Sequence, residues 1–233
     1  MLNDGGAEPR PRRSAQPARA PLVSDTTAVA DRLARPLRRG DLDQDPVTQF
    51  RTWFDAARDA GVPMPEAVSL ATATPDGRPS VRMVLLKGVD DRGFSFYTSY
   101  GSRKGRELRS NPHGALAFYW HDLGRQVRVD GPVGELRPEE SDAYFASRPY
   151  LSQLSASVSV QSEVVANREE LETAVAELRT RSAEGQVPRP ESWGGFVLAP
   201  ESFEFWQHRE DRLHDRFRYS REATGWMVER LAP

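Results

Sequence analysis

The sequence of 233 residues contains no cysteine. Disulfides, thiolate nucleophiles and cysteine-based metal centres are therefore excluded. No apolar run approaches the roughly 20 residues that a membrane-spanning helix needs, and the N-terminus lacks the apolar core of a secretory signal. The formal net charge of -2 gives no overall nucleic-acid signature. These absences favour a cytoplasmic protein with neither a membrane nor a nucleic-acid partner.

Several catalytic motifs are missing as well. The chain has no glycine-rich phosphate loop, no G-x-S-x-G nucleophile elbow and no H-E-x-x-H zinc motif. No metal site is predicted, because the four histidines are scattered along the chain, at His113, His121, His208 and His214. An enzyme without an evident nucleophile or metal needs a bound cofactor to carry its chemistry.

Residues 1–40 differ in composition from the rest of the chain. They hold eight arginines against four acidic residues, and proline, alanine, glycine and serine dominate up to Pro21. A segment of this composition buries too little apolar surface to offset the entropy of folding. We therefore expect residues 1–40 to form a disordered arm rich in Arg, Pro and Ala, and residues 41–233 to form a single domain.

The remaining sequence mixes helical and strand patterns. Asp45 and Pro46 begin an amphipathic helix, in which Phe50 and Trp53 recur at helical spacing. From Ala67 onward, short alternating runs are separated by turns such as Pro75-Asp76-Gly77, a pattern typical of antiparallel hairpins. Further helices are predicted to begin at 103, 138 and 167, and further strands at 94–98, 115–120, 126–135, 194–198, 202–207, 212–219 and 226–231. The predicted class is α+β, with an antiparallel sheet that closes toward a barrel and peripheral helices.

Lysine is almost absent from the chain. Of 32 lysines and arginines, only Lys87 and Lys104 are lysines, and both lie in the stretch from Arg82 to Lys104. A lysine ammonium is a compact point charge, whereas an arginine guanidinium is a planar fork. The use of lysine at two nearby places indicates that this stretch holds an anion.

Cations recur beside hydroxyl and amide side chains at the ends of predicted elements. Phosphate recognition uses charge-assisted donors supplemented by neutral hydroxyls and amides. The candidate anion-binding residues are Arg82, Lys87, Thr98, Ser102, Arg103, Lys104, Gln126, Tyr144, Arg148, Ser152, Gln161, Ser162, Arg212 and Arg216.

A set of motifs in a fixed order then identifies a family. They are R-M-V-L-L-K, Y-T-S-Y-G-S-R-K, Y-F-A-S-R-P, Q-S, W-G-G-F, E-F-W-Q, R-L-H-D-R-F and the C-terminal R-L-A-P. Together, from about residue 41 to the C-terminus, they resemble the pyridoxamine (pyridoxine) 5'-phosphate oxidases. The resemblance implies an FMN-binding split β-barrel and a homodimer with FMN at its interface. It also implies oxidation of pyridoxine or pyridoxamine 5'-phosphate to pyridoxal 5'-phosphate, with O2 reduced to H2O2.

The resemblance also implies roles for individual residues. Arg212 and His214 match the pair at the substrate pyridine ring and are the candidate catalytic residues, in a hydride transfer that depends on orientation. The residues that hold the substrate phosphate in the family correspond to Lys87, Tyr144, Arg148 and Ser152. The residues that contact FMN in the family correspond to Arg82, Met83, Val84, Leu85, Leu86, Lys87, Tyr97, Thr98, Arg103, Lys104, Gln126, Gln161, Ser162, Trp206 and Arg216.

Two stretches differ from the family pattern. Ser155 and Ser157 stand where the family usually has Gly and Trp, and residues 29–32 lack the Arg and Tyr of a segment that covers the active site. The Ser-rich stretch is similar to the FMN oxidases of phenazine biosynthesis, so oxidation of a dihydrophenazine carboxylate stays open as an alternative. A non-catalytic flavin or B6-phosphate binding protein is the other alternative. The retained phosphate residues favour the B6 oxidase, because a buried cation cluster without its anion is costly.

Overall fold

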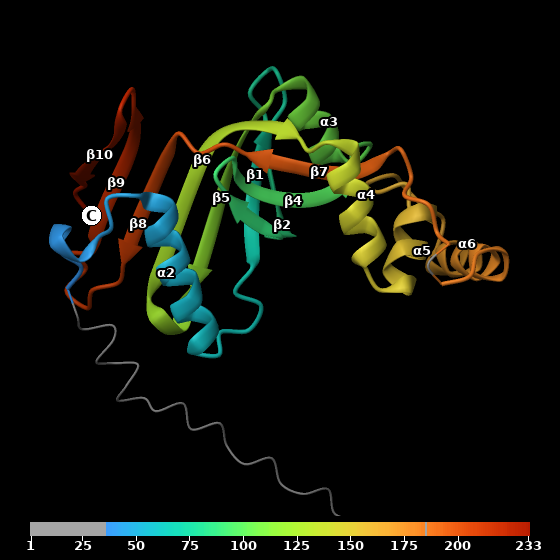
Figure 1. Cartoon of the computed structure of the whole chain (residues 1–233), viewed down its shortest axis with the longest axis horizontal. Coiled ribbons are helices and arrows are strands. Elements are labelled where there is room, and N and C mark those ends of the chain that lie inside the picture. The colour runs from blue at the N-terminus through green and yellow to red at the C-terminus, as the bar shows by residue number, and fades with distance from the viewer. Residues whose placement is uncertain (1–35, 185) are drawn as a thin grey trace, which may run out of the picture.

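An antiparallel sheet of ten strands, curled into a half-barrel, organises the computed structural model, which describes residues 36–184 and 186–233 (Figure 1). Along its main path the strand order is β10-β9-β8-β6-β5-β1-β2. A second branch leaves β6 in the order β7-β4-β3. The strands are β1 (Ala67–Ala73), β2 (Pro79–Leu85), β3 (Gly88–Asp90), β4 (Gly93–Ser99), β5 (His113–Trp120), β6 (Arg125–Glu135), β7 (Trp193–Leu198), β8 (Ser202–Gln207), β9 (Asp215–Glu222) and β10 (Gly225–Arg230).

Strand β6 joins the two sides of the half-barrel. Its first part, 125–130, pairs with β8, and its last part, 133–135, pairs with β7. Gly131 lies between the two parts, where an added Cβ would meet the carbonyl oxygen of Ala199 at 2.1 Å. Only glycine allows the backbones to approach this closely, so Gly131 marks the place where the strand passes from one side to the other.

Helix α2 (Pro46–Asp59) covers one face of the sheet, as its sequence pattern predicts. Asp45 caps it by accepting from the N–H groups of Val47 and Thr48. The buried Phe50 ring contacts the rings of Phe94 and Phe118, with centroids 4.8 and 4.9 Å away. The core of the domain therefore lies between α2 and the sheet.

The other helices gather at the far end of the sheet, beside β4 and β7 (Figure 1). They are α3 (Arg103–Ser110), α4 (Pro138–Ser147), α5 (Tyr150–Val158) and α6 (Arg168–Arg181), with short 3₁₀ turns η1 (Arg39–Asp41) and η2 (His121–Leu123) elsewhere. A second, smaller core of Phe145, Leu154, Val187 and Trp193 holds α4 and α5 against β7. This end of the molecule carries the cavity described below.

Two local predictions differ from the structure. The predicted strand 212–219 begins only at Asp215, because Arg212 has a left-handed backbone (φ 61°) that ends extended structure. Helix α5 was not predicted from its Ser-rich sequence. Its serines fit a helix because Ser155 and Ser157 donate to the carbonyl oxygens of Leu151 and Gln153, at 2.8 and 3.0 Å.

The predicted arm, 1–40, lies outside the described residues except for its last five. In those five, Leu37 is buried, and its N–H donates to Asp215 Oδ2 at 3.0 Å. Arg230 donates to the Leu37 carbonyl oxygen at 3.1 Å. The chain therefore enters the domain along its C-terminal strands, and the disorder of the arm stays a prediction.

Candidate active site

The end of β4 and the start of α3 meet at a polar group that we call the Lys104 cluster: Thr98, Ser102, Lys104, Gln161 and Ser162. Lys104 Nζ donates to Thr98 Oγ1 (3.0 Å), Ser102 Oγ (3.3 Å) and Gln161 Oε1 (3.0 Å). Ser162 Oγ accepts from the backbone N–H of Arg103 at 3.2 Å. Residues some sixty positions apart in the sequence thus meet at the N-terminal end of α3.

The ammonium of Lys104 has an unusual environment. The residue is only 7% exposed, and among the described residues its Nζ contacts neutral oxygens alone. Burial, with a smaller contribution from the nearby Arg82 charge, lowers the pKa of Lys104 to about 8. A buried cation without a carboxylate partner is costly unless an anion binds beside it. The Lys104 cluster therefore has the properties of an anion site.

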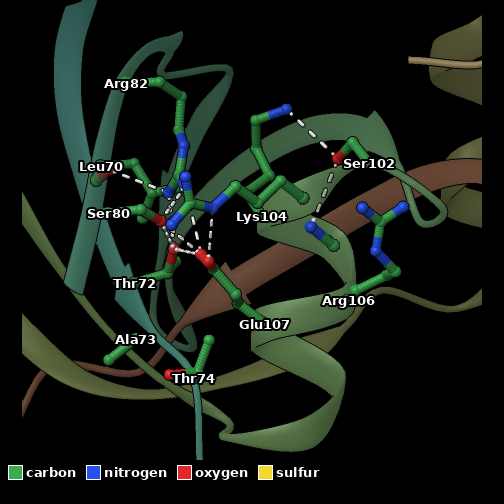
Figure 2. Close-up of polar contacts among 12 residues, drawn as sticks. Leu70, Thr72, Ala73, Thr74, Ser80, Arg82, Ser102, Lys104, Arg106 and Glu107 are labelled. Atoms are coloured by element: carbon green, nitrogen blue, oxygen red, sulfur yellow. Dashed lines mark hydrogen bonds and ion pairs between the residues drawn. The ribbon is translucent and has the colours of Figure 1, made fainter. Parts of the chain in front are cut away.

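Arg82 lies next to this cluster and is held by a dense network (Figure 2). Its Nη1 donates to Thr72 Oγ1 (2.6 Å) and to the Leu70 carbonyl oxygen (3.2 Å). Its Nη2 donates to Ser80 Oγ (2.5 Å) and pairs with Glu107 Oε2 (3.2 Å). The guanidinium is thus fixed by groups from β1, β2 and α3.

Glu107 is the anionic centre of that network. It accepts from Thr72, from Ser80 (2.5 Å), and from Arg103 Nε at 2.9 Å. Burial alone would raise the Glu107 pKa, but these hydrogen bonds and that from Arg82 outweigh burial and lower it to about 2. Glu107 was not among the predicted site residues. The available signal was its position four residues after Arg103 on a helix with no other acidic residue.

A second cationic position lies where α4 ends. The Arg148 guanidinium sits 4.7 Å from the Trp193 ring centroid, and its Nη1 is buried with no hydrogen-bond partner among the described residues. Burial lowers the Arg148 pKa. The Tyr144 ring stacks on that of Tyr97 with centroids 3.9 Å apart. Arg148 therefore rests on an aromatic wall with part of its hydrogen-bonding capacity unused.

One cavity of about 580 Å³ connects the two cationic positions. It contains many of the predicted residues, namely Met83, Val84, Leu85, Lys87, Tyr97, Thr98, Lys104, Tyr144, Arg148, Ser152 and Gln161. Sequence reasoning missed other residues that line it, namely Ser99, Ser147, Pro149, Ala156, Ser159 and Trp193. Of the two serines that differ from the family pattern, Ser155 lines the cavity and Ser157 does not.

Five predicted residues lie near the cavity without lining it. Four of them join the hydrogen-bond networks around Lys104 and Glu107, as described above, namely Arg82, Ser102, Arg103 and Ser162. Leu86 instead is buried in the main core.

The remaining predicted residues lie elsewhere in the same chain. Gln126 pairs with Trp206, and Trp206 with Arg216, so these side chains form a row across β6, β8 and β9. Arg216 pairs with Glu204 at 2.8 Å, and this hydrogen bond raises its pKa. In Figure 1, β8 and β9 lie at the opposite end of the molecule from α4 and α5. One copy of the chain therefore does not bring this row to the cavity.

The two candidate catalytic residues belong to this second group. The His214 ring packs on Trp206 with centroids 4.7 Å apart, and its Nδ1 accepts from the backbone N–H of Arg209 at 3.0 Å. In a neutral imidazole this contact assigns the proton to Nε2, which is then a donor. Arg212 is exposed on the preceding turn. The structure thus places His214 beside Trp206, with Arg212 two residues before it in the chain, and neither residue lines the cavity.

Neither a metal centre nor a membrane span was found in the part of the chain that the structure describes. In residues 36–184 and 186–233, no three His, Cys, Asp or Glu side chains are grouped so as to hold a metal ion. No helix in those ranges is both long and apolar enough to cross a bilayer.

Solved structures share the fold. PhzG from Burkholderia lata, in complex with tetrahydrophenazine-1-carboxylic acid, aligns with a TM-score of 0.80 and 36% identity over 86% of this chain and 99% of its own. A pyridoxamine 5'-phosphate oxidase-related, FMN-binding protein from Nostoc punctiforme aligns with a TM-score of 0.66 and 17% identity, over 79% and 97%. The predicted split-barrel fold is confirmed.

Sequence comparisons give the family. Residues 54–182 match the model of the pyridoxamine 5'-phosphate oxidase family, and residues 193–233 match that of the pyridoxine 5'-phosphate oxidase C-terminal dimerisation region. The pyridoxine/pyridoxamine 5'-phosphate oxidase of Rubrobacter xylanophilus is 59% identical over 82% of this chain and 88% of its own length. That of Paraburkholderia xenovorans is 53% identical over 83% and 92%. The chain therefore belongs to the pyridoxamine 5'-phosphate oxidase family.

Proposed function

We propose that the protein is an FMN-dependent oxidase that converts pyridoxine or pyridoxamine 5'-phosphate to pyridoxal 5'-phosphate, with O2 reduced to H2O2. The observation that carries the proposal is a single cavity with two separate cationic positions, at Lys104 and at Arg148. FMN and the substrate each carry one phosphate, so a site for both needs two such positions. The close identity to curated oxidases of this substrate supports the same activity.

The Lys104 cluster fits the phosphate of FMN. Lys104 and the adjacent Arg82 and Arg103 supply three positive charges. Two members of the cluster, Thr98 and Ser162, supply hydroxyls at the N-terminal end of α3. The buried ammonium, which contacts only neutral oxygens among the described residues, is the observation in favour of an anion here. When bound, FMN would supply the acceptor of the hydride.

The Arg148 position fits the phosphate of the substrate. Its buried Nη1 lacks a partner among the described residues, and Lys87, Tyr144 and Ser152 line the same cavity. A phosphate that accepts from this guanidinium would satisfy a donor whose burial is otherwise costly. The guanidinium lies against an aromatic wall of Tyr97, Tyr144 and Trp193, which would keep it in place for the phosphate. With its phosphate bound at Arg148, the substrate would have its ring restricted to one region of the cavity.

A homodimer would complete the site. The row of Gln126, Trp206 and Arg216, with Arg212 and His214, lies far from the cavity of its own chain, so a second copy would have to supply it. Exposed apolar side chains on β2 and β5 support such an interface, since Val81 is 68%, Met83 60% and Tyr119 57% exposed. The match of residues 193–233 to a dimerisation region supports it independently.

In that dimer, Arg212 and His214 would orient the substrate ring. Arg212 is exposed and would clamp the ring or its 3-oxygen, and His214 would donate from Nε2 to the same region. Neither residue needs to act as an obligatory base, because hydride transfer to a flavin can proceed through positioning and electrostatics.

Anaerobic mixing of the FMN-loaded protein with pyridoxine 5'-phosphate tests the proposal. We expect the flavin absorbance to bleach and to return, with formation of H2O2, when O2 is admitted. A protein that binds FMN and either B6 phosphate without bleaching would be a binding protein, and the proposed reaction would be wrong.

Oxidation of a dihydrophenazine carboxylate is the second candidate. The likeness to PhzG at 36% identity favours it, as does Ser155 in the cavity wall. The higher identity to B6-phosphate oxidases favours the first candidate, as does the buried Arg148 Nη1 that has no hydrogen-bond partner among the described residues. Bleaching by a dihydrophenazine carboxylate, with none by either B6 phosphate, would reverse this choice.

A further inference from the structure

Glu107 lies beside the proposed flavin site but is none of the residues that the family resemblance assigns to it. Its side chain is 5% exposed, on the turn of α3 that follows Arg103 and Lys104. The carboxylate pairs with Arg82 at 3.2 Å and with Arg103 at 2.9 Å. One buried acidic group therefore holds two of the three cations proposed to receive the phosphate of FMN.

Two hydroxyls make this arrangement rigid. Thr72 and Ser80 each donate to Glu107 Oε2 and each accept from Arg82, through different guanidinium nitrogens. Figure 2 shows these contacts as dashed lines. If each hydroxyl gives its proton to the carboxylate, its oxygen is left to accept from arginine. The orientation of Arg82 depends on Glu107 both directly and through these bridges.

Charge balance points in the same direction. Arg82, Arg103 and Lys104 with Glu107 leave two net positive charges, and a phosphate monoester carries about -1.5 to -2 charges at neutral pH. Without the carboxylate the site would have a surplus cation and two arginines free to point elsewhere. The low pKa of Glu107, about 2, keeps it ionised throughout the range in which the protein would work.

We propose that Glu107 is a positioning residue for the cofactor phosphate, which fixes Arg82 and Arg103 and matches the charge of the cluster to a dianion. The inference rests on the proposed use of FMN. It assigns Glu107 no contact with flavin or substrate, so its effect should depend on the phosphate and not on the flavin ring.

The test compares FMN with riboflavin, which has the same ring and no phosphate. Glu107→Gln keeps the size of the side chain and removes its charge. We expect the affinity for FMN to fall about tenfold, as for loss of a charged hydrogen-bond partner, while the affinity for riboflavin changes less than about twofold. Both are measured by quenching of flavin fluorescence on apoprotein whose circular dichroism matches the wild type.

Glu163→Gln is the matched control. Glu163 pairs with Arg106 at 3.1 Å, near the same end of α3, but its side chain is 54% exposed. Its loss should leave both affinities unchanged, because exposed ion pairs contribute little. Should Glu107→Gln fail to fold, Ser80→Ala removes one of the two hydroxyls that connect Arg82 to Glu107. It should lower the affinity for FMN about threefold and leave the affinity for riboflavin unchanged.

Unchanged FMN affinity in a folded Glu107→Gln protein would overturn the inference, as would equal losses for FMN and riboflavin. Either result would leave the use of FMN itself intact. A wild-type protein that binds neither flavin would instead overturn the proposed cofactor, and the role of Glu107 with it.

Discussion

The two cationic positions of the cavity differ in how completely their charges are satisfied. At the Lys104 end, arginines are tied to Glu107, Thr72 and Ser80, and the ammonium is surrounded by neutral oxygens. At the Arg148 end, a guanidinium rests on aromatic rings with a buried nitrogen unpaired among the described residues. In the proposed function, the first would be preorganised for a cofactor that stays bound, and the second would leave a donor for a substrate that exchanges at every turnover.

The largest effect is expected at the exchanging end. Arg148→Ala removes the guanidinium proposed to bind the substrate phosphate, so we expect the KM for pyridoxine 5'-phosphate to rise about 100-fold, as for loss of one partner of a buried charge pair. FMN affinity should change less than about twofold. Steady-state kinetics and flavin titration measure the two quantities. A fall in FMN affinity as large as the rise in KM would show that the two ends of the cavity do not act separately.

The next effect belongs to the cofactor end. Lys104→Gln removes the buried ammonium and keeps a hydrogen-bonding side chain, so FMN affinity should fall about 30-fold. When FMN is held in excess, the KM for the substrate should stay within about threefold of the wild type. If this variant instead raises KM as strongly as Arg148→Ala, the assignment of the two ends is wrong.

The pKa of Lys104 gives a pH test of the same comparison. Its value of about 8 in the folded apoprotein means that the ammonium loses its proton above pH 8. FMN affinity should then fall by at most about tenfold per pH unit above pH 8, since binding requires that proton. The Lys104→Gln protein should lack this dependence. An identical pH profile in both proteins would exclude Lys104 as its origin.

The same titration affects stability with a defined sign. The folded pKa of Lys104 lies below the ordinary lysine value of 10.5, so the unfolded chain binds more protons between about pH 8 and 10.5. Lys104 therefore contributes a penalty below pH 8 that is relieved as the pH rises through this window. Thermal unfolding of wild type and Lys104→Gln across these pH values, taken as a difference, isolates that contribution.

The smallest effect is expected at Lys87, which also lines the cavity. Lys87→Arg keeps the charge but replaces a point charge by a planar fork, so the KM for the substrate should rise about fivefold. Retention of FMN should be less affected. Unchanged substrate affinity would refute a role for the lysine ammonium on the substrate side.

Local sequence signals predicted much of the fold. Asp45 and Pro46 marked the start of α2, and turns such as Pro75-Asp76-Gly77 marked the hairpins. The signals were weaker where polar side chains satisfy the backbone, as in α5, whose serines donate to helix carbonyls. The start of β9 was misplaced because the left-handed conformation of Arg212 has no signature in an arginine.

The site was harder to predict than the fold. The motifs led to the residues of the cavity, but Glu107 was missed because its role depends on the packing of α3 against β1 and β2. A sequence motif also carries no information on which copy of the chain in a dimer contributes its residues to a given site. The fold, in which β8 and β9 lie at the opposite end of the molecule from α4 and α5, shows that one chain does not bring the row of Gln126, Trp206 and Arg216 to the cavity (Figure 1).

The contact between Arg216 and the end of the chain has a practical consequence. Arg216 Nη1 donates to the carbonyl oxygen of Ala232 at 2.8 Å, and the Leu231 N–H donates to the Arg216 carbonyl oxygen at 2.9 Å. The last residues thus form part of the support of a proposed flavin contact. Deletion of residues 231–233 would therefore remove two hydrogen bonds that hold the Arg216 backbone and side chain in place.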